Sequence, residues 1–499
     1  MQSREIRKVV IAGGGTAGWL AAAALSHQLG RILEITLIES DEIGTIGVGE
    51  ATIPPIRVFH KLLQIDEPAF MRATAATFKL GISFENWARK DDRYIHSFGR
   101  NGQPTWMCEF HNFWLRSREL GIESELGDYC FELQAAKANK FALSQNAEIN
   151  YAYHFDAGQY AKFLRAFSER HGIKRVEGKI REVKQNAETG FIESLVLHSD
   201  EVVAGDLFID CTGFRGLLIE QTLEAGYEDW SHWLPCDSAA AVQTELVGPA
   251  QPLTRAIAHD AGWRWRIPLQ HRVGNGLVFS SQFLSDDSAK EQLLGAIDGQ
   301  PITAPRILKF KTGRRCQVWN KNCIAMGLSS GFIEPLESTS IHLMMVAVTR
   351  LLHLFPFGGV TSSLTDQYND AARVEMEKTR DFVVLHYHAT QRDDSPFWRD
   401  CRDMPIPDSL THRIQLFREN AYAFQGDSEI FRVDSWTQVM LGQRILPDTY
   451  HPAARLVGDQ ELTKYLADFR SSVTQTVARM PVHQDFVNQY CKAANSVWA

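Results

Sequence analysis

Apolar and polar positions near the N-terminus alternate in the order expected of a strand, a turn, a helix and a second strand. Residues 9–12 (VVIA) are apolar, a glycine-rich turn follows, and residues 19–29 are apolar and rich in alanine. A second apolar run, residues 35–38, ends at Glu39. Short apolar runs bounded by turn residues are typical of buried strands, and a longer alanine-rich run is typical of a helix. The pattern predicts a β-α-β unit.

Strand patterns are concentrated in residues 1–355, whereas helical spacing dominates residues 356–499. Further predicted elements are a helix over 157–170, a hairpin over 180–183 and 191–197, a strand over 323–326, a Gly- and Ser-rich loop over 327–339, and helices that contain 343–352, 366–388 and 460–479. The fold class that follows is mixed α/β (α+β) with two lobes, divided near residue 355.

Residues 263–268 read Trp-Arg-Trp-Arg-Ile-Pro. Two tryptophans at i and i+2 lie on one face of a strand, where they form an aromatic wall. Because proline donates no hydrogen bond to a ladder, the strand is edge-like or ends at Pro268.

Composition narrows the range of functions. A chain of 499 residues exceeds one ordinary core, which favours two lobes with room for a buried cofactor. The net charge of −8 argues against nucleic acid or an anionic membrane as the main partner. The eight cysteines lack zinc-ligand spacing, so we expect reduced thiols and no metal site. No apolar run reaches the roughly 18 residues of a membrane span, and glycines interrupt the signal-like start, so a cytoplasmic protein is expected.

The turn after the first strand has the spacing Gly13-x-Gly15-x-x-Gly18. Such glycines allow a tight turn, close approach of a pyrophosphate and close helix packing, with the phosphates at the helix N-terminus. Glu39 lies about twenty residues further on, where an acid bonds a ribose hydroxyl. The turn predicts dinucleotide binding; a glycine-rich turn without a ligand is the alternative.

Residues 206–213 (DLFIDCTG) resemble the second nucleotide-contacting element of FAD-binding Rossmann flavoproteins. The unit at residues 323–353 fits the segment that meets the isoalloxazine ring in those proteins. No second GxGxxG follows for a separate NADPH domain, so a reductant must come from another protein.

Five motifs together are similar to the flavin-dependent tryptophan halogenases. They are GGGTAGW (13–19), GEATIP (49–54), FKLG (78–81), WRWRIP (263–268) and GFIEPLEST (331–339), in the family's order. The resemblance implies a Rossmann-type, flavoprotein monooxygenase-like lobe over residues 1–355, with substrate-facing insertions near 90–150 and 230–310, and a helical lobe over 356–499 that completes the substrate pocket.

The resemblance also implies a reaction. A separate NAD(P)H-dependent flavin reductase supplies FADH2, which reacts with O2 to give a flavin hydroperoxide. Chloride or bromide converts it to hypohalous acid, which halogenates an electron-rich aromatic ring. The tryptophans Trp263 and Trp265 keep the substrate away from the flavin. The implied FAD contacts are Gly13, Gly15, Thr16, Ala17, Gly18, Glu39, Gly49, Ala51, Asp210 and Gly327.

Lys79 and Glu337 match the family's catalytic pair. A lysine among apolar neighbours must find a partner or lose its proton, so Lys79 either forms a haloamine or hydrogen-bonds the hypohalous acid. Glu337 directly precedes Ser-Thr, as the family's glutamate does, and is preferred over Glu334. Without the other motifs, the pattern would favour a surface lysine at position 79 and, for Glu337, an acid that is stabilised at a helix N-terminus. Glu50 is expected to serve a structural function in a tight turn, and a catalytic contact is the less favoured alternative.

Thr339 and Ser340 begin the following predicted helix, whose free N–H groups suit a halide ion. The family usually has glycine in place of Ser340. Helix capping by the two hydroxyls is the alternative.

His96 and Phe98 match a family motif that stacks an indole, although ordinary packing is the alternative. Tyr450 and His451 are the nearest equivalents of the family's amino-acid clamp, but the segment has one tyrosine where the family has a pair, and no acid near it in the sequence fits. The incomplete clamp favours an indole-type substrate over free tryptophan.

Two other functions remain open at this point. An aromatic hydroxylase on the same fold needs its substrate close to the flavin, which the tryptophan wall opposes. In a flavin-binding protein without turnover, Lys79 and Glu337 are structural residues. A homodimer is compatible with the sequence.

Overall fold

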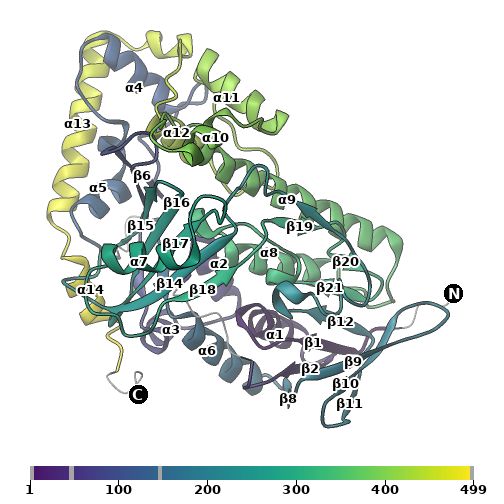
Figure 1. The fold of residues 1–499 in the computed structure, drawn as a ribbon. Helices are drawn as coiled ribbons and strands as arrows, with labels where there is room; N and C mark the ends of the chain where they lie inside the picture. The colour runs from purple at the N-terminus through teal and green to yellow at the C-terminus, as the bar shows by residue number, and fades with distance from the viewer. Residues whose placement is uncertain (1–4, 44–49, 144–148, 495–499) are drawn as a thin grey trace.

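The computed structural model describes residues 5–43, 50–143 and 149–494. A six-stranded sheet has the order β20-β21-β12-β1-β2-β8, and its pairings from β21 to β8 are parallel. The strands are β1 (Lys8–Ala12), β2 (Glu34–Glu39), β8 (Lys174–Glu177), β12 (Leu207–Asp210), β20 (Trp319–Asn320) and β21 (Cys323–Ala325). Parallel sheets are covered on both faces, which explains the continuous apolar runs of β1 and β12. The sheet lies at the lower right of Figure 1.

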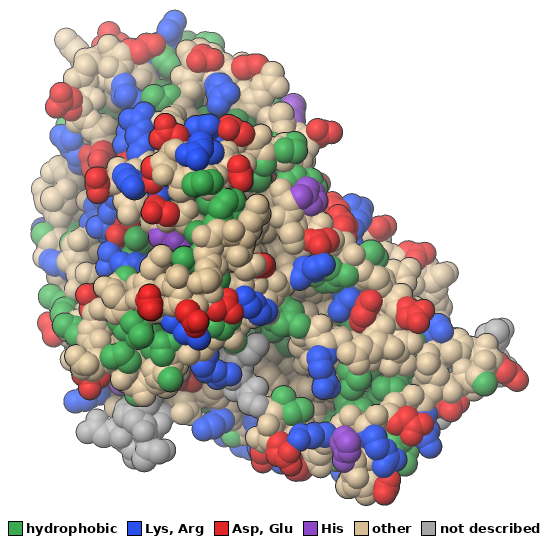
Figure 2. Space-filling model, in the orientation of Figure 1, with side chains coloured by type: hydrophobic (Ala, Val, Ile, Leu, Met, Phe, Trp, Pro, Cys, Tyr) green, Lys and Arg blue, Asp and Glu red, His purple; other side chains and the backbone are tan. Residues whose placement is uncertain are grey.

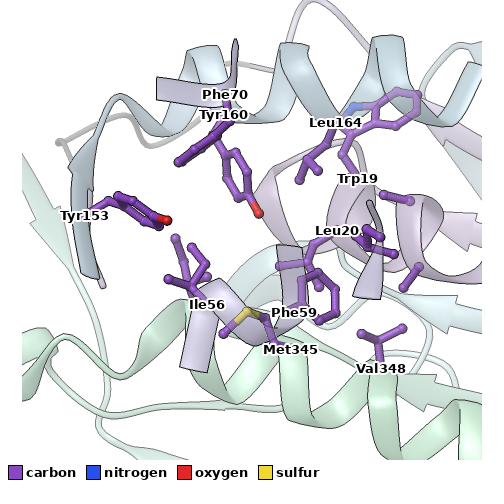
Figure 3. Packing of buried hydrophobic residues seen from close by; sticks show 14 of the residues in the cluster. Trp19, Leu20, Ile56, Phe59, Phe70, Tyr153, Tyr160, Leu164, Met345 and Val348 are labelled. Carbon is purple, nitrogen blue, oxygen red and sulfur yellow. The ribbon is translucent and has the colours of Figure 1, made fainter. Parts of the chain in front are cut away.

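Helix α1 (Thr16–Leu29) packs on one face of this sheet against β1 and β2, and α6 (Ala157–Arg170) and α8 (Ser340–His353) pack against α1. Helix α2 (Pro55–Leu62) packs on α8, and α3 (Glu67–Thr74) packs on α6. Trp19 of α1 lies near Leu164 of α6, and Met345 of α8 lies near Phe59 of α2 (Figure 3). The alanines in the middle of α1 are buried and let neighbouring helices approach closely. This packing places the N-termini of α1 and α8 at the same edge of the fold.

A seven-stranded sheet forms the second layer, in the order β18-β14-β17-β16-β15-β5-β6. Its strands are β5 (Gly81–Glu85), β6 (Arg93–Ser97), β14 (Ser238–Glu245), β15 (Leu253–His259), β16 (Gly262–Pro268), β17 (Arg272–Phe279) and β18 (Arg306–Lys309). The tryptophan strand, β16, is flanked on both sides by β15 and β17. The expected edge position is therefore wrong, and the alternative holds: the strand ends at Pro268, where the missing N–H matters least.

Three small sheets complete the β structure in the described residues. β3 (Glu50–Ala51) and β4 (Thr77–Lys79) both pair with β7 (Ala152–Phe155). The second small sheet contains β9 (Ile180–Gln185), β10 (Ile192–Leu197) and β11 (Val202–Ala204). The third contains β13 (Tyr227–Asp229), β19 (Gly313–Arg315) and β22 (Gly331–Phe332). The first of these sheets matters most for function because it carries Lys79.

The chain after residue 356 contains the helices α9 (Ser362–His388), α10 (Pro396–Asp403), α11 (Asp408–Asn420), α12 (Val433–Gly442), η5 (Pro452–Leu456), α13 (Asp459–Ala478) and α14 (His483–Tyr490). Earlier helices are α4 (Phe110–Glu119), η1 (Leu126–Tyr129), α5 (Phe131–Lys137), η2 (Gly213–Arg215) and α7 (Asp286–Ala296). α13 packs against α4 and α5 at the upper left of Figure 1, so distant parts of the sequence share that end. A lobe boundary near residue 355 stays a prediction.

The surface seen in Figure 2 interleaves acidic and basic side chains. None of the helices in the described ranges combines the length and apolar character that a membrane crossing requires.

Trp265 packs on a glycine of the neighbouring strand, which makes this contact testable. A Cβ added at Gly276 would lie 2.0 Å from the Trp265 ring. Because the ring is buried, we expect Gly276→Ala to lower the free energy of unfolding by about 1–3 kcal/mol. Urea unfolding measures this, with Gly295→Ala in α7 as the control, since a Cβ there meets nothing within 4 Å. Equal stability of the two variants would contradict the packing.

Candidate active site

The glycine turn between β1 and α1 has the geometry of a phosphate cradle. Gly13 has a φ of +110°, and a Cβ there would lie 2.3 Å from the Cys211 carbonyl oxygen. A Cβ at Gly18 would lie 1.8 Å from the Gly13 carbonyl oxygen, whereas one at Gly15 would meet nothing within 4 Å. No side chain caps the start of α1. Within residues 5–43, 50–143 and 149–494, no side chain occupies the space at this helix N-terminus, which fits a dinucleotide phosphate group held by backbone N–H groups.

Glu39 lies beside this turn at the end of β2. Its carboxylate accepts hydrogen bonds from Trp19 Nε1 (3.1 Å) and Arg175 Nε (2.6 Å). A Cβ at Gly14 would lie 1.6 Å from Glu39 Oε2, so only glycine fits there. The protein thus orients the Glu39 carboxylate beside the glycine turn.

The remaining predicted FAD contacts have different environments. Asp210 accepts hydrogen bonds from the backbone N–H groups of Thr212, Leu218 and Ile219 and from the Ser329 hydroxyl. Its carboxylate therefore anchors the chain after β12. A Cβ at Gly327 would lie 2.6 Å from Cβ of Ala17, so this glycine brings η3 (Gly327–Ser329) against α1.

Three predicted FAD contacts remain: Thr16, Gly49 and Ala51. Gly49 lies outside the described residues, and Ala51 is on β3. Burial raises the pKa of the neighbouring Glu50 carboxyl to about 7. Thr16 is the first residue of α1. Their contacts with FAD stay predictions.

Lys79 ends β4 with a fully buried side chain. Its Nζ donates hydrogen bonds to the Thr52 carbonyl oxygen (3.0 Å) and to Ser338 Oγ (2.7 Å). Burial lowers the pKa of Lys79 to about 7, although the negative charge of Glu337 opposes this shift. The structure rules out a solvent-exposed surface lysine and places an amine that titrates near neutral pH inside the protein.

Glu337 ends η4 (Pro335–Glu337) and is also buried. His96 Nδ1 lies 2.8 Å from Oε2, and His386 Nε2 lies 2.7 Å from Oε1. Burial alone would raise the pKa of this carboxyl, but His96 and His386 lower it to about 2. Because an ionised carboxylate only accepts hydrogen bonds, Nδ1 of His96 carries the proton in their contact.

Ser338 joins the lysine to the glutamate along the chain. Its φ of +59° is left-handed, and the backbone reverses here between η4 and α8. The reversal directs the Ser338 hydroxyl to Lys79 Nζ while Glu337 meets its histidines. Two residues that are distant in sequence thereby share one buried cluster.

Glu334 takes a different direction from the same loop. Its Oε2 accepts hydrogen bonds from Trp263 Nε1 (2.6 Å) and the Tyr387 hydroxyl (2.7 Å). Burial raises the pKa of Glu334 to about 7. The centroids of the Trp263 and Trp265 rings lie 6.1 Å apart. Glu334 thus orients the tryptophan wall, and Glu337 is the glutamate near the lysine.

Phe98 and His96 border the Lys79–Glu337 cluster. The Phe98 ring centroid lies 5.3 Å from Lys79 Nζ. The His96 ring lies 5.5 Å from the Phe382 ring, which stacks on Phe431 at 3.6 Å. The Phe98 ring therefore lies beside the amine and further flat rings lie beside His96, as an aromatic substrate requires.

Thr339 is the residue that precedes α8. Its Oγ1 is buried and has no hydrogen-bond partner within the described residues. The helix start carries no side-chain cap, so the capping alternative is not what the structure shows. Ser340 is the first helical residue. An unpaired hydroxyl beside free N–H groups can accommodate an anion.

Tyr450 and His451 lie in another cluster, against α4 and η5. The Tyr450 hydroxyl donates to Glu119 Oε2 (2.5 Å) and accepts from Arg455 Nε (3.0 Å). His451 Nδ1 accepts from the backbone N–H of Ala453. The structure thus commits these polar groups to protein partners and does not join them to the cluster at Lys79.

Sequence reasoning missed His386, Tyr387 and Ser338. His386 and Tyr387 end an apolar run in α9, so the only signal was a histidine in a pattern otherwise typical of core. The Ser338 contact depends on a left-handed backbone at a non-glycine residue, which spacing does not indicate.

The buried amine makes stability depend on pH. The pKa of Lys79 in the folded state, about 7, lies below its ordinary value of 10.5, so the unfolded state binds more protons between these values. Stability of the native protein therefore rises with pH in this window, by at most about 1.4 kcal/mol per pH unit. We expect Lys79→Met to lack this slope, and its stability relative to the native protein to be highest at pH 7 and to fall toward pH 10. Urea unfolding at several pH values tests this, and a pH-independent difference would contradict it.

Comparison with known proteins agrees with this geometry. A family model described as tryptophan halogenase matches residues 8–459. Tryptophan 6-halogenase SttH of Streptomyces toxytricini is 34% identical over 525 residues, covering 97% of this chain and 98% of that protein.

Two solved structures are more similar. Xcc4156, a flavin-dependent halogenase from Xanthomonas campestris, has 55% identity and a TM-score of 0.97 and covers 98% of this chain and 99% of its own. BrvH, a flavin-dependent halogenase from Brevundimonas sp. BAL3, has 44% identity and a TM-score of 0.94, with coverage of 97% and 99%. The chain thus has the FAD-binding halogenase fold, and it belongs to the flavin-dependent tryptophan halogenase family.

Proposed function

We propose that this enzyme chlorinates or brominates an indole-type ring with hypohalous acid that Lys79 holds and Glu337 helps to deliver. The observation that carries the proposal is the buried cluster in which Lys79 Nζ contacts Ser338 Oγ, with Glu337 directly before Ser338 in the chain. The Phe98 ring lies beside the same amine. A nucleophile, a carboxylate and a flat binding surface therefore surround one position.

When bound, FADH2 would give two electrons to O2, and the oxygen would accept two more from a halide, which yields hypohalous acid and water. In this chain the turn at Gly13–Gly18 would hold the phosphates and Glu39 a ribose hydroxyl. Thr339 Oγ1 and the first N–H groups of α8 would hold the halide.

Lys79 suits both forms of hypohalous acid capture. With a pKa of about 7, its amine is present near neutral pH in both protonation states. The neutral amine can take the halogen from HOX and release water as it forms a haloamine. The ammonium can donate a hydrogen bond to the oxygen of HOX and leave the halogen on it. Either route keeps the halogen beside Phe98.

Glu337 supports the attack on the ring. Held ionised by His96 and His386, it can accept the proton that the ring carbon releases once the carbon–halogen bond has formed. A carboxylate with a pKa of about 2 is a weak base, so its negative charge next to the cationic ring is its larger contribution.

Trp263 and Trp265 act as a wall in this proposal. Both rings are buried, and Trp263 is fixed by its hydrogen bond to Glu334. A rigid aromatic layer between flavin and substrate favours halogenation over direct oxygen transfer.

An indole ring is the preferred substrate, with free tryptophan second. His96 and Phe98 supply flat contacts. The relatives named tryptophan halogenases act on an indole-containing molecule. The Tyr450 hydroxyl is already bonded to Glu119 and Arg455, so it is not free to bind an amino-acid head group.

Removal of the amine tests the catalytic assignment. With FAD, a flavin reductase, NADH, bromide and indole, we expect the native enzyme to form bromoindole, detected by mass spectrometry. Lys79→Ala should form none while flavin still binds and reoxidises, because the amine acts after the oxidant is made. Glu337→Gln should lower kcat by about a hundredfold or more. Hydroxylated products alone, or full activity of Lys79→Ala, would contradict the proposal.

A second experiment addresses the halide. Thr339→Val removes an unpaired hydroxyl and keeps the side-chain shape, so we expect an increased KM for halide and unchanged thermal stability. Thr339→Ser is the matched control that keeps the hydroxyl. A halide KM that stays at the native value in Thr339→Val would remove this residue from the site.

A further inference from the structure

A cavity of about 230 Å³ lies beside the aromatic site, between the segment after β6 and the start of α12. Two of its walls continue from that site, because Arg100 follows Phe98 closely and Arg432 directly follows Phe431. Arg432 Nη2 donates a hydrogen bond to the Phe98 carbonyl oxygen (2.7 Å). The cavity and the aromatic site therefore share the chain segments on both sides of this hydrogen bond.

Two oxygen atoms of the lining side chains are buried and lack a hydrogen-bond partner in the part of the chain that the structure describes. Asn101 is 4% exposed and Thr437 is 1% exposed. Asn101 Oδ1 and Thr437 Oγ1 have no hydrogen-bond partner within the described residues. Because buried polar atoms are nearly always paired, these two atoms point to a missing ligand group.

The charged residues of the lining balance one another. Arg100 and Arg432 oppose Glu109 and Asp434. Burial raises the pKa of both carboxyl groups, and each arginine opposes the shift at Asp434. His111 carries no charge near neutral pH, because burial lowers its pKa to about 4. A lining without net charge has no preference for a tail of one sign.

We propose that this cavity binds an amide-bearing, peptide-like chain attached to the indole of the substrate. An amide N–H can donate to Asn101 Oδ1, and an amide carbonyl can accept from the Thr437 hydroxyl. The volume exceeds the roughly 30 Å³ that one water occupies, so several heavy atoms fit. An uncharged amide also avoids the desolvation cost of burying an ammonium group against the neutral side chains of Asn101 and Thr437.

The proposal rests on the indole site of the proposed function, and the test separates the two. The probes are indole, 3-butylindole, tryptamine, tryptophan and the N-acetyl amide of tryptophan. We expect the highest kcat/KM for the N-acetyl amide. A kcat/KM that is higher for 3-butylindole than for the N-acetyl amide would show that the cavity binds an apolar chain. A kcat/KM that is higher for tryptamine or tryptophan would show that it binds a charged group. Each of these results would overturn the proposal. Indole that is not halogenated would instead refute the proposed function.

Matched variants locate the effect in the cavity. Thr437→Val loses one neutral hydrogen bond, so the ratio of kcat/KM for the N-acetyl amide to that for indole should fall about fivefold. Thr437→Ser keeps the hydroxyl and should restore the ratio.

Calorimetric titration of the protein with the N-acetyl amide requires no turnover, and its Kd should increase in Thr437→Val to the same extent. An unchanged Kd and an unchanged ratio would show that the chain does not enter this cavity.

Discussion

A lysine amine with no solvent exposure, held between the Thr52 carbonyl and the Ser338 hydroxyl, is the contact on which the rest of the site depends. In water the amine would stay protonated, but burial lowers its pKa to about 7. This shift requires surroundings that exclude water, and the β3–β7–β4 sheet and the loop before α8 provide them. Nearby Glu337 limits the shift, so that the amine can exist in both forms at neutral pH.

The loop over residues 331–339 connects the parts of the site. Its first glutamate, Glu334, orients Trp263, whereas Glu337 lies between two histidines and Ser338 bonds Lys79. The same loop ends at Thr339, where α8 begins. The wall, the carboxylate, the lysine contact and the proposed halide site are therefore set by one short segment. A change of backbone at Ser338 would disturb all of them together.

The sequence was sufficient for elements defined by local patterns. The helix over 157–170 has the predicted bounds, and the β-α-β unit differs from prediction by a few residues at its ends. The position of the tryptophan strand was not predictable, because strand order depends on pairing with distant segments such as β5. The pairs Lys79–Ser338 and Glu337–His386 join residues from separate elements, so spacing alone could not reveal them. The family motifs identified Lys79 and Glu337, whereas the unpaired atoms of Asn101 and Thr437 became visible only in the structure.

The most direct measurement is the pKa of Lys79 itself. Protein with 13C-labelled lysine can be titrated by NMR, and the Lys79 signal is assigned by its loss in Lys79→Arg. A pKa of about 7 is expected in the native enzyme. A lower value is expected in Glu337→Gln, because the neighbouring negative charge that favours the ammonium is then missing. An ordinary lysine pKa that does not respond to Glu337→Gln would contradict the account of this site.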